Sequence, residues 1–295
     1  MEINIQPGVY VVAVSGGVDS VALLHMLTEK PDTKLIVAHF DHGIRSDSAE
    51  DRLLVQSLAQ QYGLHFVYDE GALGSGSSED LARVARYKFL HSVREASAAN
   101  GIITAHHNDD LLETAIHNIL RGTNWRGLIS LRSRENIHRP LLHISKKDLI
   151  AYAKDQGLVW REDSTNADLR YRRNYIRHMI LPKLSSDDRI KLLQYITTVR
   201  DRAKELDAHV INYLHIQPGV NILDRYSFVM LPHIVAREVL ASWLRNNGIK
   251  VLDTSTIERL VNAAKTYHAG RKADISGGYT LLIDKNTLAI QRYER

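Results

Sequence analysis

The sequence predicts an α/β fold in which a parallel β-sheet is flanked by helices, followed by a helical linker and a small α+β C-terminal domain. Three observations support this fold class. A short β-branched run at Val9–Val14 is typical of a strand buried on both faces, strand and helix patterns then alternate as far as Ala105, and the pattern changes after Leu181–Asp188.

The first predicted strand runs into a small, polar loop and then at once into a helical pattern with Val21, Leu24 and Leu27 on one side. Glycines let backbone N–H groups approach an anion, and a helix N-terminus adds partial positive charge. The loop therefore favours phosphate binding, although an ordinary strand-to-helix turn is the alternative. Its residues are Ser15, Gly16, Gly17, Val18, Asp19 and Ser20.

Two common nucleotide motifs are excluded at this loop. No lysine follows its second glycine, as the Gly-Lys-Ser/Thr loop of many nucleotide hydrolases requires. The three-glycine dinucleotide fingerprint is also missing.

Composition narrows the function classes further. The 295 residues suggest about two domains, and the net charge of +4 permits an anionic partner without requiring one. The absence of cysteine excludes a Cys zinc site, an iron–sulfur cluster ligated by the chain, disulfides and a thiol nucleophile. The longest apolar run is too short to span a bilayer and no signal peptide is recognisable, so we expect a cytoplasmic protein that does not bind membranes.

The next elements repeat the strand–helix order. Strands are predicted at Lys34–Phe40, Leu64–Tyr68 and Ile102–Ala105, with helices at Ser48–Tyr62 and Glu79–Ala96. This alternation implies a parallel sheet with right-handed crossovers. His39 near the end of the second predicted strand and His42 just after it fit turn positions better than catalytic ones.

An acidic cluster follows the fourth predicted strand and leads into another helix. His106, Asp110 and Glu113 are spaced by four and three residues and therefore share one helical face. Such groups can hold magnesium, accept a proton or bind an ammonium group. Helix capping by Asp109 or Asp110 is the alternative, but capping explains one acid rather than the whole cluster.

A strongly basic helix is predicted later in the same domain. Interleaved arginines and tyrosines suit binding to phosphates and stacking on bases, whereas a solvated helix face is the alternative. The candidate phosphate ligands here are Arg170, Arg172, Arg173 and Arg177.

Beyond a proline stop near Leu181, one long helix is predicted at Ile190–Tyr213. The remainder predicts a hairpin of Val220–Leu223 with Ser227–Met230, two helices, and a terminal β-pair around Gly277-Gly278. A second basic cluster, which fits either nucleic-acid binding or a plain solvent face, consists of Lys265, His268, Arg271 and Lys272.

Taken in order, several motifs in residues 9–184 resemble the bacterial tRNA(Ile)-lysidine synthetases, a family of the ATP-pyrophosphatase (PP-loop) superfamily with a Rossmann-like, adenine nucleotide alpha hydrolase-like fold. The loop alone specifies only the superfamily, and the later blocks specify the family. The motifs are Ser15–Ser20, His39–Arg45, Ala85–Leu90, Thr104–Asp110 with Glu113-Thr114, Arg139–Leu142, Glu162–Asn166 and Arg173–Arg177.

The resemblance implies a ligase that forms a C–N bond in two steps. ATP would adenylate the wobble cytidine of tRNA(Ile) with a CAU anticodon, releasing pyrophosphate, and L-lysine would then displace AMP to form lysidine. It also implies a catalytic PP-loop domain at 1–184, a helical linker at 185–215 and a small tRNA-binding domain at 216–295. The chain is expected to be too short for the second C-terminal domain of longer members, and a homodimer is one option for its assembly.

Residue roles follow from the resemblance. The Ser15–Ser20 loop would bind ATP, with Asp19 next to Mg²⁺, and Arg86 would neutralise charge on the phosphates or the adenylated base. His106 would assist base activation or proton movement, and Asp110 and Glu113 would bind and help deprotonate lysine.

Three other functions are weighed against this one. A tRNA thiolase of the same superfamily would share adenylation, but such enzymes usually need cysteines, and a related amidotransferase-type synthetase would need a glutaminase nucleophile. A catalytically silent tRNA-binding module would not need the intact loop and acidic cluster.

Overall fold

A computed structural model describes residues 1–43, 48–71, 79–134, 136–161, 169, 172–213, 221–249, 253–275 and 277–293. The chain forms two compact units, Met1–Thr197 and Thr198–Arg295, and the division falls within the long helix α8 (Ser186–Tyr213). The finer division at residues 184 and 215 into catalytic domain, linker and tRNA-binding domain stays a prediction.

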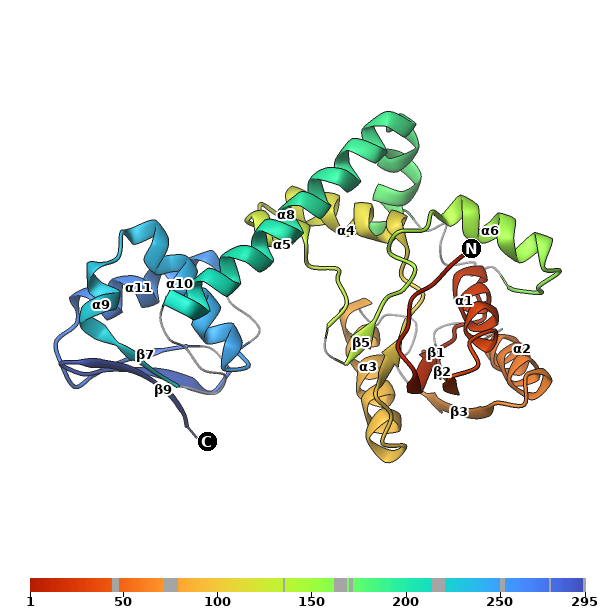
Figure 1. Ribbon diagram of the computed structural model, residues 1–295, viewed down its shortest axis with the longest axis horizontal. Coiled ribbons are helices and arrows are strands. Elements are labelled where there is room, and N and C mark those ends of the chain that lie inside the picture. The colour runs from red at the N-terminus through yellow and green to blue at the C-terminus, as the bar shows by residue number, and fades with distance from the viewer. Residues whose placement is uncertain are drawn as a thin grey trace. The chain divides into compact units, whose positions relative to one another are not determined.

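The first unit is built on a five-stranded parallel sheet, which confirms the predicted fold class (Figure 1). The strand order is β3-β2-β1-β4-β5. The sequence prediction did not include β5, because two residues carry no periodicity. The strands are β1 (Gly8–Ala13), β2 (Thr33–Asp41), β3 (His65–Glu70), β4 (Gly101–Ile103) and β5 (Ile137–His138).

Helices cover both faces of this sheet because successive strand residues point to opposite sides. Val12 packs in the core beneath α1 (Val18–Thr28), α2 (Ser48–Gln61) and α6 (Lys146–Asp155). Its neighbour Val11 packs in the core beneath α3 (Glu79–Ala96). Both strand faces are therefore buried, which explains the continuous β-branched run in the sequence.

The helices that follow β4 are α4 (Asn108–Leu120) and α5 (Trp125–Leu128). The predicted basic helix corresponds to α7 (Arg172–Tyr175), a π-helical turn at Ile176–Ile180 and a 3₁₀ turn at Leu181–Lys183. Arg170, Ile44-Arg45 and the Glu162–Asn166 motif lie outside the described residues.

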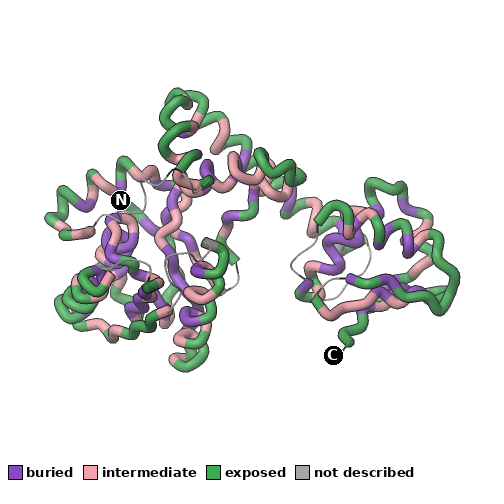
Figure 2. The backbone as a smooth tube through the Cα atoms, turned by 180° about the vertical axis from the view of Figure 1, so that it is seen from behind, coloured by how far each residue is buried: buried purple, intermediate pink, exposed green. Residues whose placement is uncertain are grey.

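In its described residues, the second unit combines a four-stranded antiparallel sheet, ordered β6-β9-β8-β7, with the end of α8 and helices α9, α10 and α11. Its own core includes Trp243, Phe228 and Leu260, and Figure 2 shows buried residues inside both units. The elements are β6 (Ile222–Asp224), α9 (Arg225–Met230), α10 (His233–Asn246), α11 (Thr254–Thr266), β7 (Arg271–Asp274), β8 (Tyr279–Ile283) and β9 (Thr287–Arg292).

The predicted hairpin near the start of this unit is wrong. The segment Ser227–Met230 belongs to α9, because the Asp224 carboxylate accepts a hydrogen bond from the Ser227 N–H at 2.7 Å and caps the helix. Strand β6 pairs instead with β9, more than sixty residues later. Across the described chain, no helix is both long and apolar enough to cross a membrane.

Because each unit has its own hydrophobic core, we expect a core mutation to destabilise mainly the unit that contains it. Trp243→Ala should cost about 3–5 kcal/mol and Leu149→Ala about 2–5 kcal/mol of folding free energy, because both side chains are fully buried. By hydrogen-exchange mass spectrometry, Trp243→Ala should accelerate exchange in α10, α11 and β7–β9, and Leu149→Ala in β1–β4. Equal acceleration in both units by either variant would show instead that the two units unfold together.

Candidate active site

The loop between β1 and α1 is held in shape by its own two serines. The Ser20 hydroxyl donates to the Gly17 carbonyl at 2.9 Å, and the Ser15 N–H donates to the Ser20 hydroxyl oxygen at 3.1 Å. Gly16 has a φ of +93°, a conformation that side-chain-bearing residues rarely adopt. Gly17 occupies the N-cap of α1 without any side-chain capping bond, so this end of the helix faces the loop's interior with its backbone donors.

Asp19 in the first turn of α1 forms an ion pair with a residue that the sequence prediction did not include. The Lys146 ammonium group lies 2.7 and 2.6 Å from the two Asp19 carboxylate oxygens. Lys146 is the first residue of α6, and Ser145 caps that helix by accepting a hydrogen bond from the Asp148 N–H at 3.1 Å. The start of α6 therefore places a cation beside the loop.

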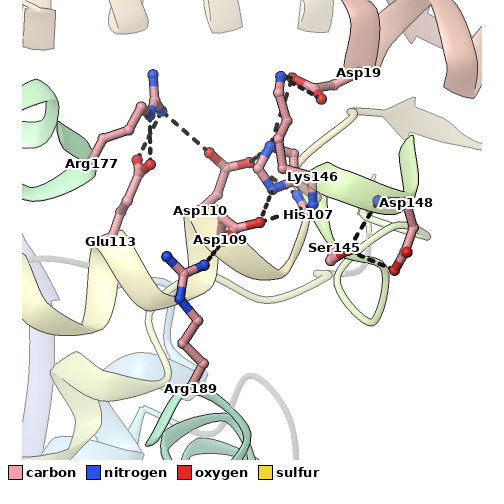
Figure 3. Close-up of polar contacts among 10 residues, drawn as sticks. All are labelled: Asp19, His107, Asp109, Asp110, Glu113, Ser145, Lys146, Asp148, Arg177 and Arg189. Atoms are coloured by element: carbon pink, nitrogen blue, oxygen red, sulfur yellow. Dashed lines mark hydrogen bonds and ion pairs between the residues drawn. The ribbon is translucent and has the colours of Figure 1, made fainter. Parts of the chain in front are cut away.

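His107 joins the loop to the acidic cluster (Figure 3). Its Nε2 lies 3.7 Å from an Asp19 carboxylate oxygen and 3.5 Å from an Asp110 carboxylate oxygen. The His107 backbone N–H also donates to Asp110 at 3.0 Å, as part of a capping box at the start of α4. Asp110 thus caps α4 and also lies near the loop. Helix capping and a role in the acidic cluster, the two alternatives for this residue, are therefore compatible.

Glu113 is buried one turn further along α4 and is engaged by Arg177. The Arg177 Nε and a terminal nitrogen donate to the two Glu113 oxygens at 2.6 and 2.9 Å, and Arg177 lies 3.7 Å from Asp110. Burial raises the pKa of Glu113 although Arg177 opposes the rise. The paired carboxylates Glu113 and Asp110 raise the pKa of Arg177 against the effect of burial. The two-bond geometry favours an ion pair here.

Asp109 connects three helices rather than pointing at the loop. One of its oxygens accepts the Lys146 backbone N–H at 2.9 Å, and the other accepts from Arg189 in the first turns of α8 at 2.8 Å. Arg189 also donates to the Leu181 carbonyl at 2.7 Å. This carboxylate therefore fixes where α6 starts relative to α4.

The charges around Asp19 and His107 shift both groups toward their ionised forms. Burial alone would raise the pKa of Asp19, but His107 and then Lys146 hold it below its usual value. Burial alone would lower the pKa of His107, but Asp19 and Asp110 raise it above its usual value against Lys146.

The preceding residue, His106, has the opposite surroundings. Its Nδ1 lies 2.8 Å from the Thr104 hydroxyl, and burial is the main reason that the pKa of His106 lies well below its usual value. The imidazole is therefore neutral at physiological pH and keeps one ring nitrogen as a hydrogen-bond donor and one as an acceptor. The positive charges that lower this pKa further belong to Arg139, Arg86, Arg83 and Arg173.

The structure thus brings the loop, Asp19, Asp110 and Glu113 into one connected cluster, and it places Arg86 and Arg173 near enough to His106 to affect its pKa. Arg172 is exposed on α7. Sequence reasoning missed Lys146, His107 and Arg189 as members of the cluster. The Ser145 N-cap signal marks where α6 begins, but no local pattern indicates which side chain reaches Asp19.

Comparison with known proteins gives a consistent result. The family model of the PP-loop domain matches residues 4–184. A tRNA(Ile)-lysidine synthase from Solibacter usitatus is 32% identical over 90% of this chain and 63% of the relative, so the chain spans somewhat less than two thirds of that protein. A tRNA(Ile)-lysidine synthase from Parasynechococcus marenigrum is also 32% identical, over 95% of this chain and 87% of the relative.

Among solved structures, a U34-tRNA thiolase from Methanococcus maripaludis, which contains a 4Fe-4S cluster, has a similar fold. The TM-score is 0.55 at 17% sequence identity, and the match covers 66% of this chain and 73% of the thiolase. At this identity the similarity concerns the fold alone.

The environment of His106 predicts a measurable titration. Its imidazole should stay neutral below pH 6.5, and Arg86→Gln should raise its pKa because one nearby positive charge is lost. Since the unfolded chain binds this proton more tightly, the residue's contribution to stability should be lost as pH falls from 6.5 toward the folded pKa. NMR of ring-labelled histidine measures the titration, with Lys88→Gln, exposed on the same helix, as the matched control. An unchanged titration in Arg86→Gln would contradict the assignment.

Proposed function

The chain belongs to the tRNA(Ile)-lysidine synthase family of PP-loop proteins, and we propose that it is the ATP-dependent ligase that forms lysidine at the wobble cytidine of tRNA(Ile) with a CAU anticodon. In the first step the 2-carbonyl oxygen of the cytidine bonds to the α-phosphorus of ATP, and the electron pair of the broken P–O bond leaves on pyrophosphate. In the second step the amine of L-lysine bonds to the activated carbon, and AMP leaves.

The observation that carries this proposal is the position of His107 between Asp19 and Asp110. The chemistry needs a nucleotide and an amine at the same base. An anion-binding loop and an acidic cluster within about 4 Å of a shared imidazole meet that need, whereas distant sites would not. A tRNA-binding module without catalysis has no use for this arrangement.

We assign the ATP phosphates to the loop formed by Ser15, Gly16, Gly17, Val18, Asp19 and Ser20, because the N-terminus of α1 attracts anions. Arg86 supplies positive charge to the phosphates or the adenylated base. His106, kept neutral by its surroundings, assists activation of the base or proton movement through its ring nitrogens.

We assign the lysine amine to Asp110 first and Glu113 second. The Asp110 side chain keeps 22% of its surface accessible, whereas Glu113 keeps 4% and both its oxygens are already bonded to Arg177. An incoming ammonium therefore meets Asp110 before Glu113. Glu113 holds Arg177 and adds negative charge to the same pocket.

We assign the tRNA phosphates to Arg170, Arg172, Arg173 and Arg177. Of these arginines, Arg177 contacts the acidic residues Glu113 and Asp110. Arg177 acts within the acidic cluster while it is bonded to Glu113, so the exposed Arg172 is the better candidate for a phosphate contact. We further propose that the protein works in the cytoplasm, and a homodimer stays a prediction.

The site offers Mg²⁺ one protein carboxylate, that of Asp19. Within the described segments no group of three or more acidic, histidine or cysteine side chains is arranged to hold a metal. Mg²⁺ in nucleotide sites is usually bound through one or two carboxylates, with phosphates and water completing its shell, so the single carboxylate of Asp19 suffices. The ion, once bound with ATP, would supply positive charge against the phosphate oxygens.

The similarity in fold to a tRNA thiolase does not favour sulfur transfer here. A sulfur-transfer enzyme of that kind needs cysteine thiolates as cluster ligands or persulfide carriers, and the sequence contains no cysteine. The lysidine-forming reaction requires no thiol.

The direct test of the proposal is incorporation of radiolabelled lysine into an unmodified tRNA(Ile) transcript. Label should enter the tRNA only when ATP is present, and AMP and pyrophosphate should appear in amounts equal to the lysine incorporated. A transcript with guanosine at the wobble position is the control. Tight tRNA binding without any ATP-dependent incorporation would show a binding module instead.

The lysine assignment predicts a selective kinetic defect. Asp110→Asn should raise the KM for lysine about tenfold to a hundredfold, because a hydrogen bond to a charged group is worth about 1.5–3 kcal/mol, while the KM for ATP changes little. Glu113→Gln should also reduce the thermal stability, since it removes the buried negative charge that pairs with Arg177 through two hydrogen bonds. Normal lysine kinetics in an Asp110→Ala, Glu113→Ala double variant would overturn the carboxylate assignment.

A further inference from the structure

The ion pair between Lys146 and Asp19 is placed where a phosphate ligand would arrive. Both Asp19 oxygens accept from the ammonium group, at 2.7 and 2.6 Å, directly beside the loop at the N-terminus of α1. The Lys146 side chain is 39% exposed and therefore accessible to a ligand. A cation in this position is able to contact a phosphate bound at the loop.

The loop itself lacks a lysine. Loops of the Gly-Lys-Ser/Thr type carry their own lysine, which contacts the outer phosphates, whereas Val18 and Asp19 follow the two glycines here. Lys146 reaches the same region from a helix 127 residues later in the chain. The structure thus supplies from α6 the cation that the loop does not encode.

The backbone of Lys146 is fixed while its side chain is able to move. The Lys146 N–H donates to Asp109 at 2.9 Å, and Asp109 is itself held by Arg189 at 2.8 Å. The ammonium group is carried on a flexible four-carbon chain with rotatable donors. A short rotation of the side chain can therefore exchange one anionic partner for another without moving α6.

Electrostatics favours such an exchange when ATP binds. In the free protein Lys146 neutralises part of the charge on Asp19, together with His107 at 3.7 Å. A triphosphate carries more negative charge than one carboxylate and gains still more on the bridging oxygen as pyrophosphate leaves. The strongest attraction for the ammonium group then lies on the departing phosphates.

We propose that Lys146 is a catalytic residue of the adenylation step, which pairs with Asp19 in the free protein and binds the leaving pyrophosphate when ATP is present. This role rests on the proposed function. The bond from the cytidine oxygen to the α-phosphorus forms, the bond from the α-phosphorus to the bridging oxygen breaks, and Lys146 stabilises the resulting charge without giving up a proton. Asp109 and Arg189 are positioning residues for it.

The test compares Lys146→Met with Lys147→Met, an exposed neighbour that loses the same charge. Isothermal titration calorimetry with magnesium-free inorganic pyrophosphate should show binding weakened about tenfold to a hundredfold in Lys146→Met and unchanged in Lys147→Met. Lys146→Arg should restore part of the affinity. The melting temperature of the free protein should change little, because a partly exposed ion pair adds little stability.

Kinetics provides the second measurement. In the lysine-incorporation assay Lys146→Met should lower kcat strongly and leave the KM for lysine unchanged, since the residue acts before lysine attacks. If Lys146→Met binds pyrophosphate and turns over like the wild type, Lys146 is only a structural partner of Asp19 and the inference is wrong. If the wild type incorporates no lysine yet pyrophosphate binding still depends on Lys146, the proposed function fails and the phosphate contact stands.

Discussion

The adjacency of β1 and β4 in one parallel sheet determines the whole site. Parallel neighbours end at the same edge, so the loop after β1 and the first turn of α4 after β4 must meet there. His107 is the point of contact, because its imidazole lies between Asp19 of the loop and Asp110 of α4. The pairing of β1 with β4 thus brings Asp19 and His107, about ninety positions apart in the sequence, into contact.

Two adjacent histidines at this edge have opposite electrostatic surroundings. His107 faces carboxylates, which raise its pKa, whereas His106 lies in a buried region surrounded by arginines, which lower its pKa. His107 occupies the N-cap of α4 and lies near Asp19 and Asp110, whereas His106, one residue earlier, contacts Thr104 and lies near arginines. Under the proposed function, the carboxylates near His107 suit the lysine amine, the arginines near His106 add positive charge for the adenylated base, and the phosphates bind at the loop beside Asp19 and Lys146.

The sequence predicted the elements that depend on local patterns and missed the contacts that depend on distance along the chain. Strands β1 and β4 were predictable because their residues are apolar and largely buried from both sides of the sheet. The hairpin expected at the start of the second unit was predicted wrongly because the Asp224 cap outweighed a weak β pattern in Ser227–Met230. The Lys146–Asp19 and Arg177–Glu113 pairs join residues 127 and 64 positions apart, and no periodicity reports such partners.

The acids of the cluster are all in contact with cationic groups before any ligand binds. Asp19 faces Lys146, Asp109 faces Arg189, Glu113 faces Arg177, and Asp110 lies between His107 and Arg177. The Glu113 carboxylate is buried, so separating it from Arg177 is costly because the carboxylate would lose its main partner in a poorly solvated place. Separating the partly exposed pair of Asp19 and Lys146 costs little free energy, because water can solvate both charges. Under the proposed function, we expect ligands to bind by exchange at the accessible members, Lys146 for phosphate and Asp110 for the amine, while the Glu113–Arg177 and Asp109–Arg189 pairs keep the geometry of the site fixed.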